Sequence, residues 1–302
     1  MSLETDLLLD RRRLMRRLVF WRLLAVLAVL AAVAVALPEL GVEPVEGAHV
    51  ARLTVSGLIT EDPKLVRTLD ALADDPKVKA LEVMIDSPGG TVAGGEALHD
   101  AIARVAARKP VAAIMGGVAA SAAYMIAVAA QRIFCLPGTL TGSIGVMLEA
   151  PEISGLMAKL GIADEVLVSG PLKNQPSLTR PLSDEGRAML QGLVKELSEQ
   201  FIGLVAAGRH LPLKRVRSLA DGRPYTGQQA VTLGLADALG GEHEARVWLA
   251  EAKGIPLSLP VQDVETETLL QRVAEVSSRL TFRAILKALL GQSLALDSAW
   301  AL

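Results

Sequence analysis

The sequence predicts an α/β fold with a mainly parallel sheet, preceded by one N-terminal transmembrane helix. Short apolar segments alternate with segments of helical spacing between residues 49 and 136, which is the order expected of βαβ units. Aromatic residues make up only 3% of the 302 residues, while alanine, leucine and valine are abundant, a composition that suits close packing of helices on a sheet. A run of 20 residues, 18–37, carries a single charge and is about long enough to span a bilayer core.

The charges around this apolar run predict its orientation. Six arginines lie between residues 11 and 22, and three glutamates lie between residues 39 and 46. Because positive charge marks the cytoplasmic side, we expect 1–17 to be a cytoplasmic basic segment and the later residues to be translocated. A cleavable signal peptide is the alternative, since Ala34-Val35-Ala36 offers a small-residue cleavage site. The basic segment is long for a signal peptide, so we favour an uncleaved anchor over 18–37.

The rest of the chain divides into three predicted parts. Residues 38–47 contain two prolines, two glycines and three glutamates, and they predict a linker between membrane and domain. Residues 48–262 hold the alternating strands and helices of the main domain. Residues 263–302 are expected to form a C-terminal helical segment.

Each element of the main domain is predicted from its hydrophobic period and its end signals. Strands are expected at His49–Val55, Val78–Ile85, Val111–Met115, Arg132–Leu136, Glu165–Val168 and Leu257–Val261. Helices are expected at Pro63–Ala73, Val92–Ala107, Ala119–Ala130, Ile153–Leu160, Asp184–Gly208, Leu213–Leu219, Gly227–Leu233, Glu242–Lys253 and Glu265–Leu290. Thr91 and Ser183 precede two of these helices and are expected to cap them.

Composition excludes several classes of function. A formal net charge of −2 argues against a general nucleic-acid binder, and the single cysteine, Cys135, cannot form an intramolecular disulfide. The chain has no H-E-x-x-H motif, no Cys/His cluster and no G-x-x-x-x-G-K-[ST] loop. We therefore expect no metal site and no cofactor.

The stretch Gly116–Ala127 carries the main candidate for chemistry. It is a run of small residues, GGVAASAAYMIA, with one hydroxyl, that of Ser121, at the predicted passage from strand to helix. A serine there is well placed for a nucleophile, because the start of a helix stabilises nearby negative charge. The alternative is a small-residue helix packed tightly in a core.

Three further motifs accompany Ser121. Asp86–Gly90 ends in two glycines, which can turn a backbone N–H outward toward a developing oxyanion. Thr141–Gly145 is a turn with two hydroxyls, and Lys173 lies in a loop with no acidic residue within five positions. Taken singly, these features are also compatible with an ordinary β–α turn and a solvated surface lysine.

Together the motifs resemble those of the signal peptide peptidase A family. The resemblance is carried by GGVAASAAYMIA, TGSIGV, DSPGG, the SGPLK loop and DGRPYTGQQAVTLGLAD, in this family's order over roughly residues 50–240. This is a family of membrane-anchored Ser–Lys proteases, with a core like that of Clp protease and crotonase. The chain departs from the family where Ala122-Ala123 replaces the usual Gly-Gly and where Asp86 replaces the usual asparagine.

The resemblance implies a role for each residue of the site. Ser121 would be the nucleophile, Lys173 the general base, and Ser143 the residue that holds the lysine amine. The backbone N–H groups of Gly90 and Ala122 would form the oxyanion hole. A lysine acts as a base only where its surroundings disfavour the ammonium form, which agrees with the lack of acidic neighbours in its loop.

A Ser–His–Asp triad is the weaker alternative. Among the four histidines, His99 is followed by Asp100 on a predicted helix. Adjacent helical positions point in different directions, so we expect no working pair there.

The sequence therefore predicts a serine endopeptidase that degrades short hydrophobic peptides, such as released signal peptides. The resemblance implies location in the inner membrane of a bacterium, with the N-terminus cytoplasmic and the catalytic domain outside. It also implies a ring-shaped homo-oligomer in which one active site can draw on two subunits. From the residues alone, the apolar helices Asp184–Gly208 and Glu265–Leu290 are equally compatible with closing the core of a monomer. The alternatives are an inert membrane-tethered scaffold on the same fold and, less favoured, an acyl-CoA enzyme of the crotonase type.

Overall fold

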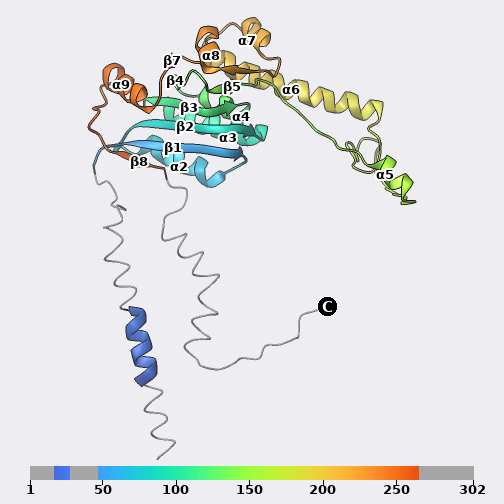
Figure 1. Ribbon diagram of the computed structural model, residues 1–302, viewed down its shortest axis with the longest axis horizontal. Coiled ribbons are helices and arrows are strands. Elements are labelled where there is room, and N and C mark those ends of the chain that lie inside the picture. Colours follow the sequence, from blue (N-terminus) through green and yellow to red (C-terminus); the bar gives the residue numbers. More distant parts are fainter. Residues whose placement is uncertain (1–16, 28–46, 265–302) are drawn as a thin grey trace, which may run out of the picture. The chain divides into compact units, whose positions relative to one another are not determined.

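The computed structural model describes residues 17–27 and 47–264 (Figure 1). Residues Gly47–Val264 form one compact unit built on a sheet of eight strands. The strands follow the order β6-β5-β3-β2-β1-β8, with β4 paired to β3 and β7 paired to β4. Every pair is parallel except β5 with β6, so the prediction of a mainly parallel α/β sheet is confirmed.

The strands and helices of this unit have the following bounds. The strands are β1 (His49–Ile59), β2 (Val78–Gly90), β3 (Val111–Ala120), β4 (Arg132–Cys135), β5 (Leu140–Gly142), β6 (Pro224–Thr226), β7 (Ala238–Leu239) and β8 (Val261–Asp263). The helices are α2 (Pro63–Asp74), α3 (Val92–Ala106), α4 (Ala122–Ala127), α5 (Ser154–Lys159), α6 (Asp184–Arg209), α7 (Leu213–Leu219), α8 (Gly227–Leu233) and α9 (Glu242–Lys253).

Local hydrogen bonds explain where the main helices begin. The Thr91 hydroxyl accepts the backbone N–H of Gly94 at the start of α3, and the Ser183 hydroxyl accepts that of Gly186 at the start of α6. Each such cap stabilises its helix by about 1 kcal/mol. Both predicted caps are confirmed.

The two faces of the sheet are covered differently. Helices α2, α3 and α4 pack on one face, which we call the inner face. There, alternate strand residues such as Leu53, Val83 and Met115 join one large hydrophobic core. On the outer face, α9 covers the beginning of the strands, where Leu249 packs on Val50 and Ala80. Among the described residues, α9 does not pack on the C-terminal ends of β2 and β3. The candidate site lies at those ends.

Some predicted boundaries are wrong because strand pairing overrides the local sequence. β2 continues through the expected turn as far as Gly90, since Gly89 and Gly90 pair with Leu58 and Ile59 of β1. Likewise β3 runs to Ala120, which delays the start of the following helix. The strand expected at Glu165–Val168 does not form, because no strand among the described residues is available to pair with it. The last strand is β8 rather than Leu257–Val261.

The predicted anchor is described only in part. Residues 17–27 are helical, and their apolar side chains are exposed, among them Phe20, Trp21 and Leu27. No helix within the described ranges is both long and apolar enough to cross a membrane. Residues 28–37 of the predicted anchor, nearly all of the linker and the helix expected at Glu265–Leu290 lie outside the described residues.

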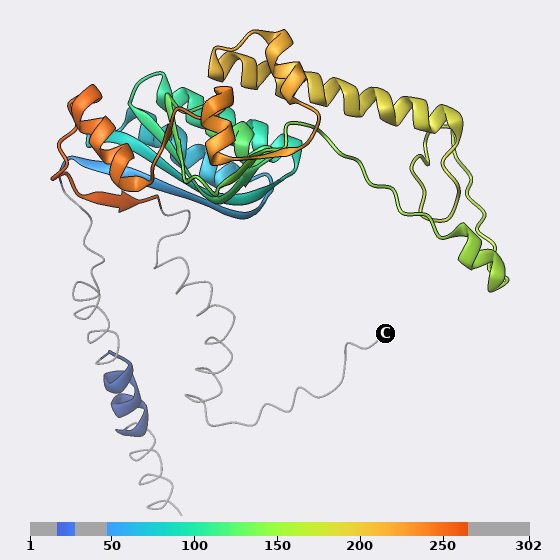
Figure 2. The same cartoon turned by 45° about the horizontal axis from the view of Figure 1, so that its top comes forward.

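Residues 148–183, which we call the arm, connect the sheet to α6. The arm extends away from the sheet along α6, and α5 lies near its tip (Figures 1 and 2). Its two limbs are joined where the Ile153 N–H donates to the Leu178 carbonyl at 2.8 Å. Its exposed large apolar residues are Leu148, Ile153, Leu156, Leu160, Ile162, Leu167, Val168, Leu172 and Leu178.

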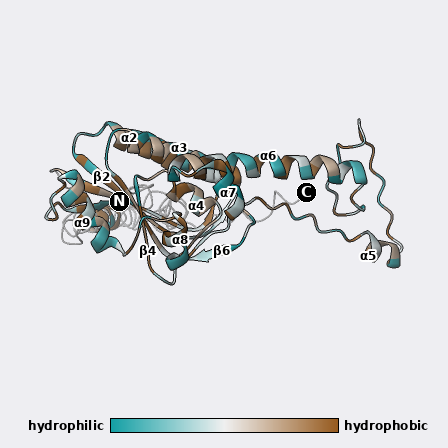
Figure 3. Cartoon of the chain, turned by 90° about the horizontal axis from the view of Figure 1, so that it is seen from above, coloured by the Kyte–Doolittle hydropathy of each residue, from teal (hydrophilic) through white to brown (hydrophobic). Residues whose placement is uncertain are grey.

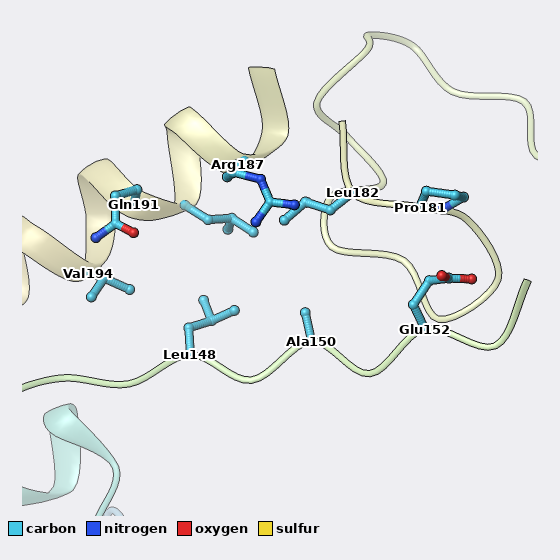
Figure 4. Close-up of a pocket in the computed structure, with 9 residues that line it drawn as sticks. Leu148, Ala150, Glu152, Pro181, Leu182, Arg187, Gln191 and Val194 are labelled. Carbon is cyan, nitrogen blue, oxygen red and sulfur yellow. The ribbon is translucent and has the colours of Figure 1, made fainter. Parts of the chain in front are cut away.

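The arm also forms a groove against the first turns of α6 (Figure 4). The groove encloses about 490 Å³ and is lined by Leu148, Ala150, Glu152, Pro181, Leu182, Arg187, Leu190, Gln191 and Val194. Hydrophobic and hydrophilic residues alternate along the whole of α6 (Figure 3). The arm and α6 therefore expose apolar side chains that the described part of the chain leaves largely uncovered.

A buried carboxylate lies under α9 on the outer face. Glu82 of β2 is fully buried, with Arg246 Nε 3.7 Å and Arg52 Nε 3.9 Å from its two oxygens. Neither oxygen has a hydrogen-bond partner among the described residues. Burial raises the pKa of Glu82 to about 7, an effect that Arg246 and Arg52 oppose and Glu242 reinforces.

The raised pKa of Glu82 predicts a pH-dependent stability. The pKa of Glu82 in the folded state lies above its ordinary value of 4.5, so the protonated carboxyl favours the folded state at low pH. This stabilisation of the fold is lost as pH rises through about 7. When the pH rises from 5 to 8, deprotonation of Glu82 should lower the free energy of unfolding by about 2.5 kcal/mol. The Glu82→Gln variant should lack that loss, which urea unfolding at the two pH values will measure.

The matched control is Glu251→Gln, which changes an exposed carboxylate of α9, the helix that covers Glu82. Its pH dependence should equal that of the unmodified protein. If Glu82→Gln also behaves like the unmodified protein, Glu82 has an ordinary pKa in the folded state.

Candidate active site

Ser121 sits between the end of β3 and the start of α4. Its backbone has φ 55° and ψ −124°, a left-handed conformation that is uncommon for a residue with a side chain. The conformation is held by two hydrogen bonds, from Ser121 N–H to the Gly142 carbonyl at 2.9 Å and from Met125 N–H to the Ser121 carbonyl at 3.0 Å. Strain of this kind persists where the surrounding structure imposes it, and it is typical of functional sites.

Gly89 packs directly against the Ser121 backbone. Its φ is 113°, and a Cβ atom there would lie 2.9 Å from the Ala120 oxygen and from Ser121 Cβ. A Cβ at Gly90 would overlap the backbone of Ile59 in β1. Both positions therefore require glycine, and the close approach brings the end of β2 to the candidate nucleophile.

The backbone N–H of Gly90 is directed toward the β3 side of β2. Thr91 N–H donates to the Ile59 carbonyl of β1 at 2.9 Å, and successive N–H groups of a strand point to opposite edges. Gly89 N–H is already bonded to the Ser87 hydroxyl at 3.1 Å. Gly90 is thus the glycine of the pair whose N–H is oriented toward the Ser121 side.

Ala122 supplies the first backbone N–H of α4, which has no partner within the helix. Its nitrogen would lie 3.2 Å from a Cβ placed on Gly89. This N–H is therefore close to the glycine that packs against Ser121. The Ala122 methyl is buried and faces Gly95 of α3, where a Cβ would lie 3.0 Å away. The methyl that replaces the family's usual glycine hydrogen therefore packs between helices.

Ser143 lies beside this junction. It follows Gly142, which accepts the Ser121 N–H and pairs with Ala120 in the sheet. Its own backbone is left-handed, with φ 48°, and its hydroxyl donates to the Gly222 carbonyl at 3.2 Å. Three non-glycine residues with positive φ occur in the described chain, and two of them are Ser121 and Ser143.

Lys173 is not brought to Ser121 within one chain. It belongs to the arm, its side chain is exposed, and its backbone N–H donates to the Gly170 carbonyl at 3.1 Å. The segment between α5 and α6 that contains it lies far out along α6, away from the β3–α4 junction (Figures 1 and 2). A single chain therefore gathers Ser121, Ser143 and the two backbone N–H groups without the lysine.

Supporting polar residues were missed at the sequence level. The Ser87 hydroxyl donates to the Gly57 carbonyl at 2.6 Å, and the Thr141 hydroxyl donates to the Ala119 carbonyl at 2.7 Å. These bonds brace the strand ends on either side of Ser121. Both residues stand inside the quoted motifs, so their position next to the glycines was the available signal.

One expectation about the histidines is wrong. His99 Nδ1 lies 2.9 Å from Asp100 Oδ1, so the adjacent pair does make contact. No hydrogen bond joins His99 or Asp100 to Ser121 in the described part of the chain. Within that part, no group of three or more His, Cys, Asp or Glu residues is arranged to hold a metal ion.

Ser121 thus combines a strained backbone with the close approach of Gly89 and of the first N–H of α4. The comparisons indicate a peptidase, since residues 103–256 match the model of peptidase family S49. The chain belongs to this family, which confirms the resemblance carried by its sequence motifs.

Two relatives and one solved structure illustrate the match. A protein of Synechocystis described as a candidate protease is 39% identical over 208 residues, which cover 68% of this chain and 75% of that protein. A chloroplastic serine protease of Arabidopsis thaliana, SPPA, is 33% identical over 211 residues, which cover 70% of this chain but 31% of that protein. A point mutant of ClpP1 from Listeria monocytogenes aligns over 64% of this chain and 92% of its own, with 16% identity and a TM-score of 0.42.

Proposed function

We propose that this chain is a membrane-anchored serine endopeptidase that uses a Ser–Lys dyad to degrade short hydrophobic peptides. Membership of peptidase family S49 supports a peptidase. The observation that carries the finer proposal is the left-handed Ser121 at the β3–α4 junction, in contact with the glycine pair that ends β2.

The proposed chemistry follows from this geometry. Ser121 Oγ attacks the scissile carbonyl, and its proton passes to the amine of Lys173. The N–H groups of Gly90 and Ala122 then donate to the oxyanion of the tetrahedral intermediate, which is commonly a large contribution to the rate. The protonated amine returns the proton to the leaving nitrogen, and water hydrolyses the acyl-enzyme in the same way.

The position of the arm supports a site shared between subunits. Lys173 belongs to the arm, which leads away from Ser121 of its own chain. The arm also exposes many large apolar residues, including Leu160 and Leu167, which are 65% and 90% exposed. Exposed apolar surface of this extent usually marks an interface. We therefore propose a ring-shaped homo-oligomer in which the arm of one copy brings Lys173, held by Ser143, to Ser121 of the next.

The apolar N-terminus supports membrane attachment and the choice of substrate. Residues 18–37 are long and apolar enough in sequence to serve as an anchor, with the arginines on the cytoplasmic side. An enzyme held at the outer face of a bacterial inner membrane would meet released signal peptides and other membrane-derived fragments. An enclosed ring would admit these short peptides and exclude folded proteins.

Labelling with a fluorophosphonate probe tests the proposal. The full chain in detergent should be labelled on one residue, Ser121, and the Ser121→Ala variant should not be labelled. Peptide mapping by mass spectrometry will locate the adduct. An unlabelled chain would favour the inert scaffold, and a label on another serine would refute the assignment of Ser121.

A further inference from the structure

A groove on the outer face of the sheet leads toward the candidate active site. It encloses about 380 Å³ and is lined by Arg52, Thr54, Met84, Ile85, Asp86, Ile114, Gly116 and Glu242. Its lining includes Glu242, the first residue of α9, and Asp86, near the end of β2. Met84 and Ile114 form an apolar floor between charged ends.

The two ends of the groove differ in net charge. At one end, Arg52 is paired with Glu242, so these charges compensate each other. At the other end, Asp86 is exposed, and no cation forms an ion pair with it in the described part of the chain. The groove therefore carries one uncompensated negative charge, at the end nearer to Ser121.

The carboxylate of Asp86 is held in a fixed position. Its Oδ1 accepts the backbone N–H of Val118 at 3.0 Å, across from β2 to β3. Gly116 and Gly117 leave room for it, since a Cβ on Gly117 would lie only 3.4 Å from Oδ1. One oxygen thus anchors the group to β3, and the second oxygen is available to a ligand.

The distance from Asp86 to the nucleophile corresponds to a few residues of peptide. Asp86 precedes Gly89 by three positions on β2, and Gly89 packs against Ser121. At about 3.3 Å per residue, this separation is at most about 10 Å, because the three steps from Asp86 to Gly89 match only two of β1. It corresponds to two or three residues of an extended peptide.

We propose that Asp86 makes this enzyme prefer peptides with a lysine or arginine about three residues from the scissile bond, with apolar side chains beside it in the groove. The proposal rests on the proposed peptidase function and names its substrate class more closely. A fixed carboxylate in a partly apolar groove discriminates by attracting the basic side chain and rejecting an acidic one.

Matched peptides test the preference. Fluorogenic peptides with an apolar sequence are made in pairs that carry either lysine or norleucine at one position, scanned over four positions on each side of the cleaved bond. The full chain in detergent should cleave the lysine peptide about threefold to tenfold faster, in kcat/KM, at one position two to four residues from that bond. Raising the salt concentration from about 0.05 M to 0.5 M should reduce the preference.

The Asp86→Asn variant isolates the charge. Asparagine retains an oxygen for the Val118 N–H, so the fold and the rate on norleucine peptides should remain within about twofold. The preference for lysine should disappear. Asp100→Asn, which removes an exposed carboxylate of α3, is the matched control and should retain the preference.

Three results would overturn the proposal. They are an absence of lysine preference at every position, a preference that survives in Asp86→Asn, and an equal loss of activity on all peptides in that variant. The last result would mean that Asp86 serves the catalytic groups or the fold. Failure of the peptidase function itself would look different, because the unmodified chain would then cleave neither series and both proposals would fall.

Discussion

Replacing Ser121 with alanine should lower kcat/KM for peptide cleavage by about four orders of magnitude or more, because the reaction loses its nucleophile. The fold should be unaffected. Alanine and serine meet the same strain at φ 55°, and the structure assigns the Ser121 side chain no capping hydrogen bond. Progress curves with a hydrophobic fluorogenic peptide and a thermal unfolding curve will measure both quantities.

The control for this substitution is Ser218→Ala, which removes an exposed hydroxyl of α7 that donates to the Arg215 carbonyl. Its activity should equal that of the unmodified chain. If a pure preparation of Ser121→Ala cleaves the peptide at an undiminished rate, the nucleophile is another residue and the site at the β3–α4 junction is structural.

Mixing two inactive variants should restore activity. Lys173→Ala should be as inactive as Ser121→Ala, because the nucleophile then has no base. If each site takes its serine from one copy and its lysine from the next, randomly mixed rings contain intact sites at about one quarter of the positions. Co-expression of the two variants should therefore give about a quarter of the unmodified activity.

The composition of the mixture provides the internal control. Activity should be greatest at equal amounts of the two variants and should vanish when either is present alone. If no ratio restores cleavage while each variant still assembles, serine and lysine belong to the same chain. The arm would then have to fold back onto its own sheet.

The helices could be predicted from sequence wherever local signals determine their ends. The bounds of α7, α8 and α9 agree with the prediction. For α8 the reason is a capping box, in which Thr226 and Gln229 satisfy each other's backbone N–H groups, and Gly234 ends the helix in a left-handed conformation. Such signals act within four or five residues and are visible in a single sequence.

Strand ends could not be predicted in the same way, because they depend on partners distant in sequence. The DSPGG motif was interpreted as a turn, yet it belongs to β2 because β1 continues alongside it. The apolar segment Glu165–Val168 has the composition of a strand but lies in the arm, where the described part of the chain offers it no partner strand. Pattern supplies a propensity, and pairing decides whether a strand forms.

The same distinction applies to the candidate site. Ser121, Ser143, Gly90 and Ala122 were predicted to act together. The chain places Ser121, Ala122 and Ser143 at one junction, and Gly90 follows Gly89, which packs against Ser121. The position of Lys173 could not be inferred, since it depends on the path of an arm that pairs with no strand of the described chain. The roles of these residues remain predictions for the experiments above.

The direction in which the arm extends has a consequence for the activity of a newly synthesised chain. The 26 residues of α6 lead to a segment that carries the proposed base away from the nucleophile of the same molecule. Under the proposed sharing of sites, a solitary chain is inactive, and assembly with further copies switches the activity on. Destructive activity would then arise only where the membrane has collected enough copies to close a ring.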